Sequence, residues 1–173
     1  MILVAYASKH GATAGIAERI AERLSERGHE TEARSVDLIE ALEHFDAVVL
    51  GSAVYAGSWR KEAVAFAERH AQALRRIPVW MFSSGPLGDR VADQEEQPRQ
   101  LEKIRRSISP RDHRMFFGAL DMSTLSFGER MIVKAVKAPE GDFRDWDEID
   151  AWADSIDDAL EGDDRVGGRA AVS

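Results

Sequence analysis

Short runs of apolar residues alternate along the chain with longer segments in which apolar residues recur at helical spacing. The first run, residues 2–7, is continuous and rich in branched side chains, which is typical of a strand buried on both faces. We expect the helix that follows to be capped by Thr13 and to end at Gly28. Residues 29–36 then predict an edge strand and residues 38–42 a short helical turn.

The same alternation continues toward the C-terminus. It predicts three more strands, at residues 47–50, 79–82 and 114–120, and three more helices, at residues 59–76, 94–108 and 147–160. Strands that alternate with helices indicate a parallel sheet with right-handed crossovers and with helices on both faces. We therefore predict one doubly wound α/β domain over residues 1–160, followed by a flexible polar tail over residues 161–173.

Composition narrows the chemistry without identifying it. The 173 residues include 31 Asp and Glu against 23 Lys and Arg, a formal net charge of -8, which disfavours nucleic acid as a partner. The absence of cysteine excludes disulfides, iron–sulfur clusters and thiol nucleophiles, and the five histidines show no spacing typical of metal ligands. No apolar run is long enough to span a membrane and no signal peptide is visible, so we expect a cytoplasmic protein.

Three loops rich in glycine and serine follow the first, third and fourth predicted strands. The carboxyl ends of parallel strands meet at one edge of a sheet, and ligands bind there. In the first loop, the hydroxyls of Ser8 and Thr13, the small Gly11 and the amides that open the next helix are suited to hold a phosphate. A plain tight turn explains the same residues, and that interpretation stays open.

The other two loops carry groups suited to a flat ring. Tyr55 stands between Gly51 and Gly57, whose backbone freedom lets an aromatic side chain stack on a ligand. Ser83 and the residues after it offer amides and hydroxyls to ring carbonyl oxygens. A partly buried tyrosine and an ordinary turn are the alternatives. A mononucleotide with an extended ring system would use all three loops.

These loops and the opening strand resemble those of the flavodoxin-like FMN-binding family. The resemblance implies a flavodoxin-like five-stranded parallel sheet in the order 2-1-3-4-5, a helical insertion after strand five, and noncovalent FMN. It places the phosphate on the first loop, the isoalloxazine against the second and its pyrimidine edge near the third. The residues that we expect to contact FMN are Ser8, Lys9, His10, Gly11, Ala12, Thr13, Ala53, Val54, Tyr55, Ala56, Gly57, Ser83, Ser84, Gly85, Pro86 and Leu87.

The charged pair Lys9 and His10, with the segments 117–121, 127–132 and 145–146, is similar to the flavodoxin-type protoporphyrinogen oxidases that pass electrons to menaquinone. This second resemblance implies an FMN-dependent oxidoreductase with a porphyrinogen or a quinone as substrate. Two alternatives stay open. One is a non-catalytic electron carrier that docks through its acidic surface onto a redox partner protein, and the other is an interaction module without a cofactor.

The predicted insertion, residues 122–138, is basic in an acidic chain. Arg130, Lys134 and Lys137 fall on one helical face, against a single acidic residue, Glu129. Such a helix is suited to peripheral contact with the anionic inner face of a membrane, where quinones are found. A helix that packs its apolar side onto the sheet and leaves its lysines in water is the other interpretation.

Overall fold

The computed structural model describes residues 1–55, 57–85, 100–128, 130–131 and 140–170. The strands of its main sheet are β1 (Ile2–Ala7), β2 (Thr31–Ser35), β3 (Ala47–Tyr55), β4 (Ser58–Trp59), β5 (Val79–Ser84) and β6 (Asp112–Phe116). A separate antiparallel pair joins β7 (Ala119–Leu120) to β8 (Gly141–Asp142). The helices are α1 (Ala12–Glu26), α2 (Lys61–Arg69), α3 (Ala71–Leu74), α4 (Leu101–Ile108) and α6 (Trp146–Ala170), with single 3-10 turns at Val36–Leu38 and Met122–Thr124.

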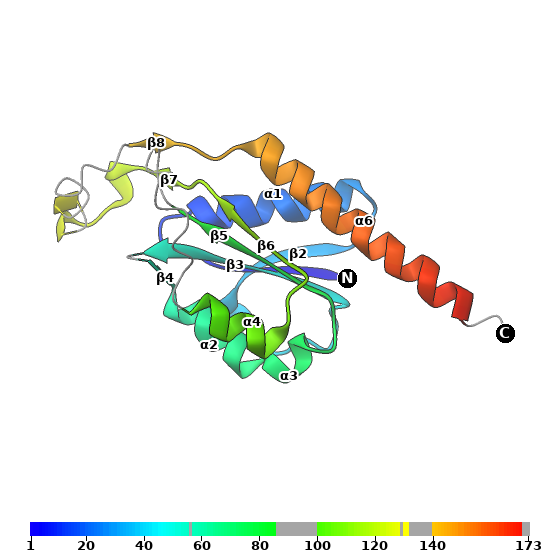
Figure 1. The fold of residues 1–173 in the computed structure, drawn as a ribbon. Coiled ribbons are helices and arrows are strands. Elements are labelled where there is room, and N and C mark those ends of the chain that lie inside the picture. The colour runs from blue at the N-terminus through cyan, green and yellow to red at the C-terminus, as the bar shows by residue number, and fades with distance from the viewer. Residues whose placement is uncertain (56, 86–99, 129, 132–139, 171–173) are drawn as a thin grey trace.

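The main sheet has the order β2-β1-β3-β5-β6, and all these neighbours are parallel. Helices α1 and α6 cover one face, and α2, α3 and α4 cover the other (Figure 1). The strand β4 lies off this path and pairs antiparallel with the end of β3. When this short strand is set aside and the five parallel strands are numbered in chain order, their order is 2-1-3-4-5. The predicted strand order is therefore confirmed.

The central strands are buried on both faces, as their continuous apolar sequences predict. One core cluster lies between the sheet and the helices α2 to α4, and a second lies between the sheet and the helices α1 and α6. In the second cluster the rings of Phe82, Phe116 and Trp152 pack at centroid distances of 5.5 to 6.2 Å. These rings fix α6 against β5 and β6.

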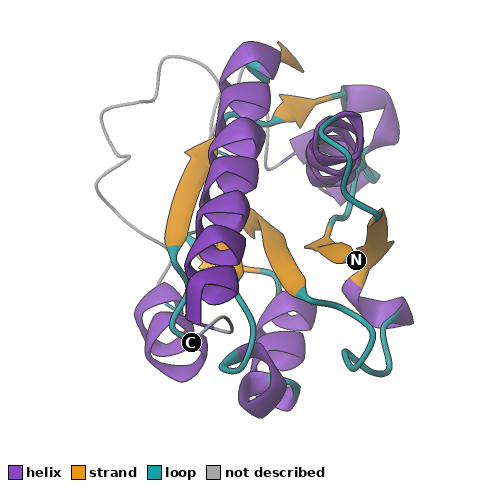
Figure 2. Cartoon of the chain, turned by 90° about the vertical axis from the view of Figure 1, so that its right-hand side faces the viewer, coloured by secondary structure: helices purple, strands orange, loops and turns teal. Residues whose placement is uncertain are grey.

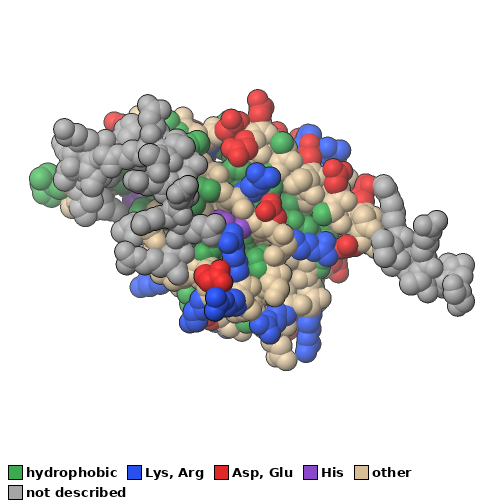
Figure 3. Space-filling view, viewed as in Figure 1, with side chains coloured by type: hydrophobic (Ala, Val, Ile, Leu, Met, Phe, Trp, Pro, Cys, Tyr) green, Lys and Arg blue, Asp and Glu red, His purple; other side chains and the backbone are tan. Residues whose placement is uncertain are grey.

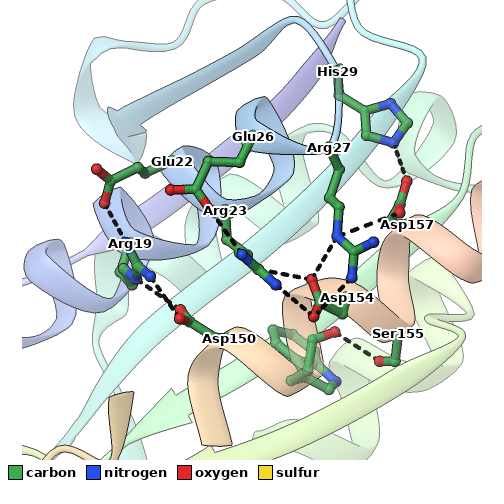
Figure 4. Close-up of polar contacts among 11 residues, drawn as sticks. Arg19, Glu22, Arg23, Glu26, Arg27, His29, Asp150, Asp154, Ser155 and Asp157 are labelled. Atoms are coloured by element: carbon green, nitrogen blue, oxygen red, sulfur yellow. Dashed lines mark hydrogen bonds and ion pairs between the residues drawn. The ribbon is translucent and has the colours of Figure 1, made fainter. Parts of the chain in front are cut away.

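A ladder of ion pairs joins α6 to α1 along their exposed side (Figure 4). Arg19 donates to both carboxylate oxygens of Asp150, at 2.7 and 2.6 Å, and Arg23 donates in the same way to Asp154, at 2.8 and 2.9 Å. Arg27 adds a further bond to Asp154. The hydrogen bonds from Arg23 and Arg27 hold the pKa of Asp154 well below its usual range.

Several predicted boundaries in the C-terminal half are wrong. The helix predicted at 59–76 is two helices, α2 and α3, that meet at His70, because the backbone there leaves the helical region. The strand predicted at 114–120 is split into β6 and β7. The helix α6 continues past Leu160, where the predicted helix ends, to Ala170 (Figure 2), so the backbone of residues 161–170 in the predicted flexible polar tail is helical.

Three boundaries in the N-terminal half also differ. The edge strand is limited to β2, and the helical turn predicted at 38–42 lies earlier, at Val36–Leu38. The N-cap of α1 is Gly11 rather than the predicted Thr13. Thr13 is only 1% exposed, because it lies inside the helix on the face that packs on the sheet.

Candidate cofactor site

The register of the sheet brings the three predicted loops to one edge. Ala7, the last residue of β1, lies beside Ser52 of β3, and Ala53 lies beside Ser84, the last residue of β5. The loop after β1, the end of β3 and the segment after β5 therefore leave the sheet side by side. β3 runs on past its neighbours to Tyr55.

The first loop turns at Gly11, which has a φ of 89°. Its amide donates to the Ser8 hydroxyl at 3.1 Å, and its carbonyl accepts the first helical bond from Gly15 at 2.9 Å. A Cβ built on Gly11 meets nothing within 4 Å among the described residues, so the space in front of the loop is open. Gly11 has no side chain with which to cap α1, and no side-chain cap bond is made there. Free helix N-terminal amides of this kind are suited to bind an anion.

The other first-loop residues surround this turn. Lys9 is exposed at the tip, and His10, Ala12 and Ser8 are partly buried. Thr13, which the sequence placed among the phosphate ligands through its hydroxyl, is buried against the sheet. The group that Thr13 offers at the start of α1 is therefore its backbone amide in the first turn rather than a side chain at the surface.

The second predicted loop is a β-hairpin. Tyr55 pairs with Ser58, and Gly57 makes the turn with a φ of 69°. Tyr55 is 46% exposed at the end of this hairpin, Ala53 is buried, and Val54 is partly buried; Ala56 lies outside the described residues. Gly57 thus has the unusual backbone that the sequence predicted.

Gly51, unlike Gly57, does not have an unusual backbone conformation. Gly51 is not among the glycines with positive φ, and it lies within β3, opposite Phe82 of β5. A Cβ at this position would lie 2.0 Å from the ring of Phe82. The glycine is needed because the phenyl ring fills the space above it, so its role is packing and not a turn.

The third predicted loop begins with two buried serines. Ser83 is 0% exposed, and its hydroxyl is bonded inside the fold, so this side chain does not face the open edge. After Ser84, Gly85 takes a φ of 141°, donates its amide to the carbonyl of Phe116 at 3.1 Å and lies against Val54. The start of the third loop therefore touches the hairpin. Pro86 and Leu87 lie outside the described residues.

Two residues at this edge were missed by the sequence reasoning. Gly118, after β6, packs against Ser84 and Gly85, where an added Cβ would lie 3.4 Å from the Ser84 hydroxyl. Arg144, after β8, reaches the first turn of α1, where its Nη1 would lie 2.5 Å from a Cβ built on Gly15. The glycines at 15 and 118 were the available signals, but nothing local shows that Arg144 reaches α1, because Ala12, whose carbonyl it contacts there, is 132 residues away in the sequence.

Arg144 is fixed by its own neighbours. Asp142 accepts two bonds from its guanidinium, at 2.8 and 2.6 Å, and the group stacks over the ring of Trp146 at 4.5 Å. The bonds from Arg144 lower the pKa of Asp142, which keeps this carboxylate charged. The pair therefore fastens the segment after β8 to the start of α1 and adds little net charge there.

A partly buried polar network, also missed, lies behind the second and third loops. The indole N–H of Trp59 donates to the Ser83 hydroxyl at 2.7 Å, and the same oxygen lies 2.8 Å from Nε2 of His113. On the other side of the ring, Nη2 of Arg105 lies 3.2 Å from Nδ1 of His113. Burial and the charge of Arg105 lower the pKa of His113 to about 4, so the imidazole is neutral at physiological pH.

The predicted insertion after strand five is present between β7 and β8. Residues 127, 128, 130 and 131 are helical, and Phe127 and Met131 are 82% and 56% exposed. The guanidinium of Arg130 donates to the carbonyls of Leu125 and Ser123, at 3.0 and 3.3 Å. Lys134 and Lys137, the other residues of the predicted basic face, lie outside the described residues.

Charge is unevenly spread over the surface. On the face seen in Figure 3, acidic side chains gather mostly over α6, whose described side chains include no Lys or Arg, and many basic side chains lie over the part of the molecule around α4. Within the described part of the chain, no group of three or more His, Asp or Glu side chains is placed to hold a metal ion. Nor is any helix in that part apolar over enough length to cross a bilayer.

Comparison with known proteins gives a consistent picture of the fold. Residues 3–147 match the family model described as a flavodoxin domain. A flavodoxin from the domain Archaea is 18% identical with a TM-score of 0.55, over 79% of this chain and 98% of its own. The two-electron reduced flavodoxin of Megasphaera elsdenii is 17% identical with a TM-score of 0.56, over 68% and 85%.

A larger enzyme contains the same fold. The rubredoxin:oxygen oxidoreductase of Desulfovibrio gigas is 11% identical with a TM-score of 0.63, over 93% of this chain and only 36% of the enzyme. No curated protein matches the sequence.

Proposed function

Since the chain belongs to the flavodoxin domain family, which indicates FMN as its cofactor, we propose that it is an FMN-dependent redox protein with its cofactor at the carboxyl edge of the sheet. The observation that carries this proposal is the first loop. Gly11 has a left-handed backbone, the Ser8 hydroxyl orders the turn, and the space in front of it is open at the start of a 15-residue helix. This arrangement fits a phosphate.

The remaining contacts are assigned by position. The backbone amides between Ser8 and Thr13 would hold the phosphate, and the side chain of Tyr55, exposed at the hairpin, would lie against the isoalloxazine. The start of the third loop, at Ser84 and Gly85, would lie near the pyrimidine edge. FMN supplies one-electron and two-electron redox chemistry when bound, and the protein sets its position and surroundings.

The direct test is the absorption spectrum of the purified protein and its thermal midpoint with and without added FMN. We expect the bands of oxidised flavin and a midpoint that rises with FMN, because a ligand that binds only the folded state stabilises it. A colourless protein whose midpoint ignores FMN would refute the proposal and favour the interaction module without a cofactor.

The finer form of the proposal is an enzyme of the protoporphyrinogen oxidase type that passes electrons to a quinone. The observation that favours it is the insertion between β7 and β8, on which Phe127 and Met131 are exposed. Porphyrinogens and quinones are large and apolar, and an exposed phenyl ring is suited to contact either. A peripheral membrane contact that includes Arg130, Lys134 and Lys137 belongs to the same proposal.

A turnover assay distinguishes the enzyme hypothesis from the electron-carrier hypothesis. The FMN-loaded protein is assayed with protoporphyrinogen IX and a soluble menaquinone analogue, and Phe127→Ser is compared with Leu38→Ser, a matched change at another exposed apolar residue. The enzyme hypothesis expects turnover that falls in Phe127→Ser alone. Bound flavin without turnover supports the electron carrier, whose acidic face over α6 would then dock onto a redox partner.

A further inference from the structure

The polar network behind the site joins four elements. Trp59 belongs to β4, Ser83 to β5, His113 to β6 and Arg105 to α4. Trp59 and Ser83 are buried, so the loss of a partner here would leave a polar group without water to replace it. Such a network is stable only when its members are satisfied together.

The bonds define the tautomer of His113. A guanidinium only donates hydrogen bonds, so Nδ1 of His113, which faces Nη2 of Arg105, is the acceptor. In the neutral ring Nε2 then carries the hydrogen and donates it to the Ser83 hydroxyl. His113 therefore cannot take the proton of Ser83, so the two residues do not act as a catalytic nucleophile and its general base. The Ser83 oxygen accepts from both Trp59 and His113.

This geometry fastens the hairpin to the end of β5. Trp59 pairs with Val54, next to Tyr55, so the position of its indole is tied to the position of the hairpin. Its backbone amide donates to the side chain of Gln100 at 3.3 Å, directly before α4. Ser83 is followed by Ser84 and Gly85, the start of the third loop. The hydroxyl of Ser83 is thus the point at which the two loops assigned to the ring are joined.

We propose that His113 is a positioning residue for the flavin ring: by its hydrogen bond to Ser83 it fixes the Tyr55 hairpin relative to the start of the third loop. The inference rests on the proposed function, because it concerns the same FMN site. His113 does not contact that edge itself, and it acts through Ser83 and Trp59. The first loop, which would hold the phosphate, has no part in the network.

Because the network lies on the side of the site assigned to the flavin ring and not on the side assigned to the phosphate, two flavins that differ only in the phosphate test the proposal. Apo protein is titrated with FMN and with riboflavin, which lacks the phosphate, for His113→Leu, His113→Gln and Trp59→Phe. His113→Leu and Trp59→Phe each remove one bond to Ser83, and we expect both flavins to bind about tenfold more weakly, with the ratio of their affinities unchanged. His113→Gln keeps an N–H donor and a carbonyl acceptor, and we expect it to restore binding to within about threefold of the wild type.

Two further readouts distinguish positioning from stability alone. The visible circular dichroism of bound flavin, which reports the surroundings of the ring, should change in Trp59→Phe and His113→Leu and stay close to that of the wild type in His113→Gln. In the apo wild type, ¹⁵N NMR should show His113 protonated at Nε2. Trp59→Phe keeps an aromatic ring, so it tests the same network if His113→Leu does not fold.

The inference is overturned if Trp59→Phe and any folded His113→Leu bind riboflavin as tightly as the wild type, whatever their melting temperatures. It is also overturned if the ratio of FMN to riboflavin affinity falls, since that would place the effect on the phosphate. Failure of the wild type itself to bind FMN would refute the proposed function instead, so the two failures are distinguishable.

Discussion

Substitution of Gly11 by valine tests the phosphate site most directly. The φ of Gly11 is 89°, a conformation that costs a residue with a Cβ about 1–2 kcal/mol, and β-branching adds to that cost. The new side chain would also project into the open space in front of the first loop. We therefore expect two separate effects, a loss of stability in the apo protein and a loss of affinity for the phosphate.

The two effects have different sizes. At about 2–4 °C per kcal/mol for a chain of this length, the strain should lower the apo melting temperature by roughly 2–8 °C. A phosphate held by two backbone amides gains about 1.5–3 kcal/mol from each charge-assisted bond. The loss of both corresponds to an affinity for FMN that is lower by a factor on the order of 10² to 10⁴.

The assay is fluorescence titration of the apo protein with FMN and with riboflavin. Gly28 offers a matched control, because it has a φ of 99°, is equally open, and lies at the other end of α1. Gly28→Val should lose similar stability and keep its FMN affinity, whereas Gly11→Val should lose FMN affinity and keep most of its affinity for riboflavin. Unchanged FMN affinity in Gly11→Val would refute the assignment of the phosphate to this loop.

The remaining predictions concern stability. The pKa of His113 is about 4 in the fold against about 6.5 in the unfolded chain, so the unfolded state binds more protons between these pH values. Stability therefore falls as the pH drops through this window, by up to roughly 3 kcal/mol. Urea unfolding at several pH values should show a smaller loss of stability in His113→Gln. Asp154→Ala removes the partner of two arginines and should lower the thermal midpoint more than Asp158→Ala, a change at an exposed residue of the same helix. The difference between the two midpoints should shrink in high salt, and equal midpoints would contradict a stabilising role of the ion-pair ladder. Gly51→Ala should lower the free energy of unfolding by about 1–3 kcal/mol because the new Cβ overlaps the ring of Phe82. In a double-mutant cycle, Phe82→Leu should destabilise the Gly51→Ala variant less than it destabilises the wild type.

Local sequence was enough to find the parallel strands and the loops that follow them. Residues 2–7 and 79–82 were identified as strands because continuous apolar runs have few alternatives in a chain of this composition. The boundaries that failed depend on partners elsewhere. Residues 51–55 read as a loop because of their small side chains, but they are strand because β5 pairs with their first part and β4 with their end.

The same division holds for the candidate site. Ser8, Gly11 and Gly57 were recognised because a turn needs a hydroxyl or a positive φ at a fixed place in the sequence. Ser83 was assigned to the ligand for the same kind of reason, yet its hydroxyl is taken by Trp59 and His113, which lie 24 and 30 residues away.

The sequence by itself determined the doubly wound sheet and the edge where the cofactor loops gather, because these follow from hydrophobic runs and from the handedness of crossovers. The strand order was predicted from the resemblance to the flavodoxin-like family. Only the tertiary structure decided what individual side chains do. It turned Ser83 from a candidate ligand into a buried acceptor, gave Gly51 a packing role, and brought Arg144 to the start of α1. The physical reason is that a side chain's hydrogen bonds and close contacts are set by its neighbours in space, and a periodic pattern carries no information about which distant residues those are.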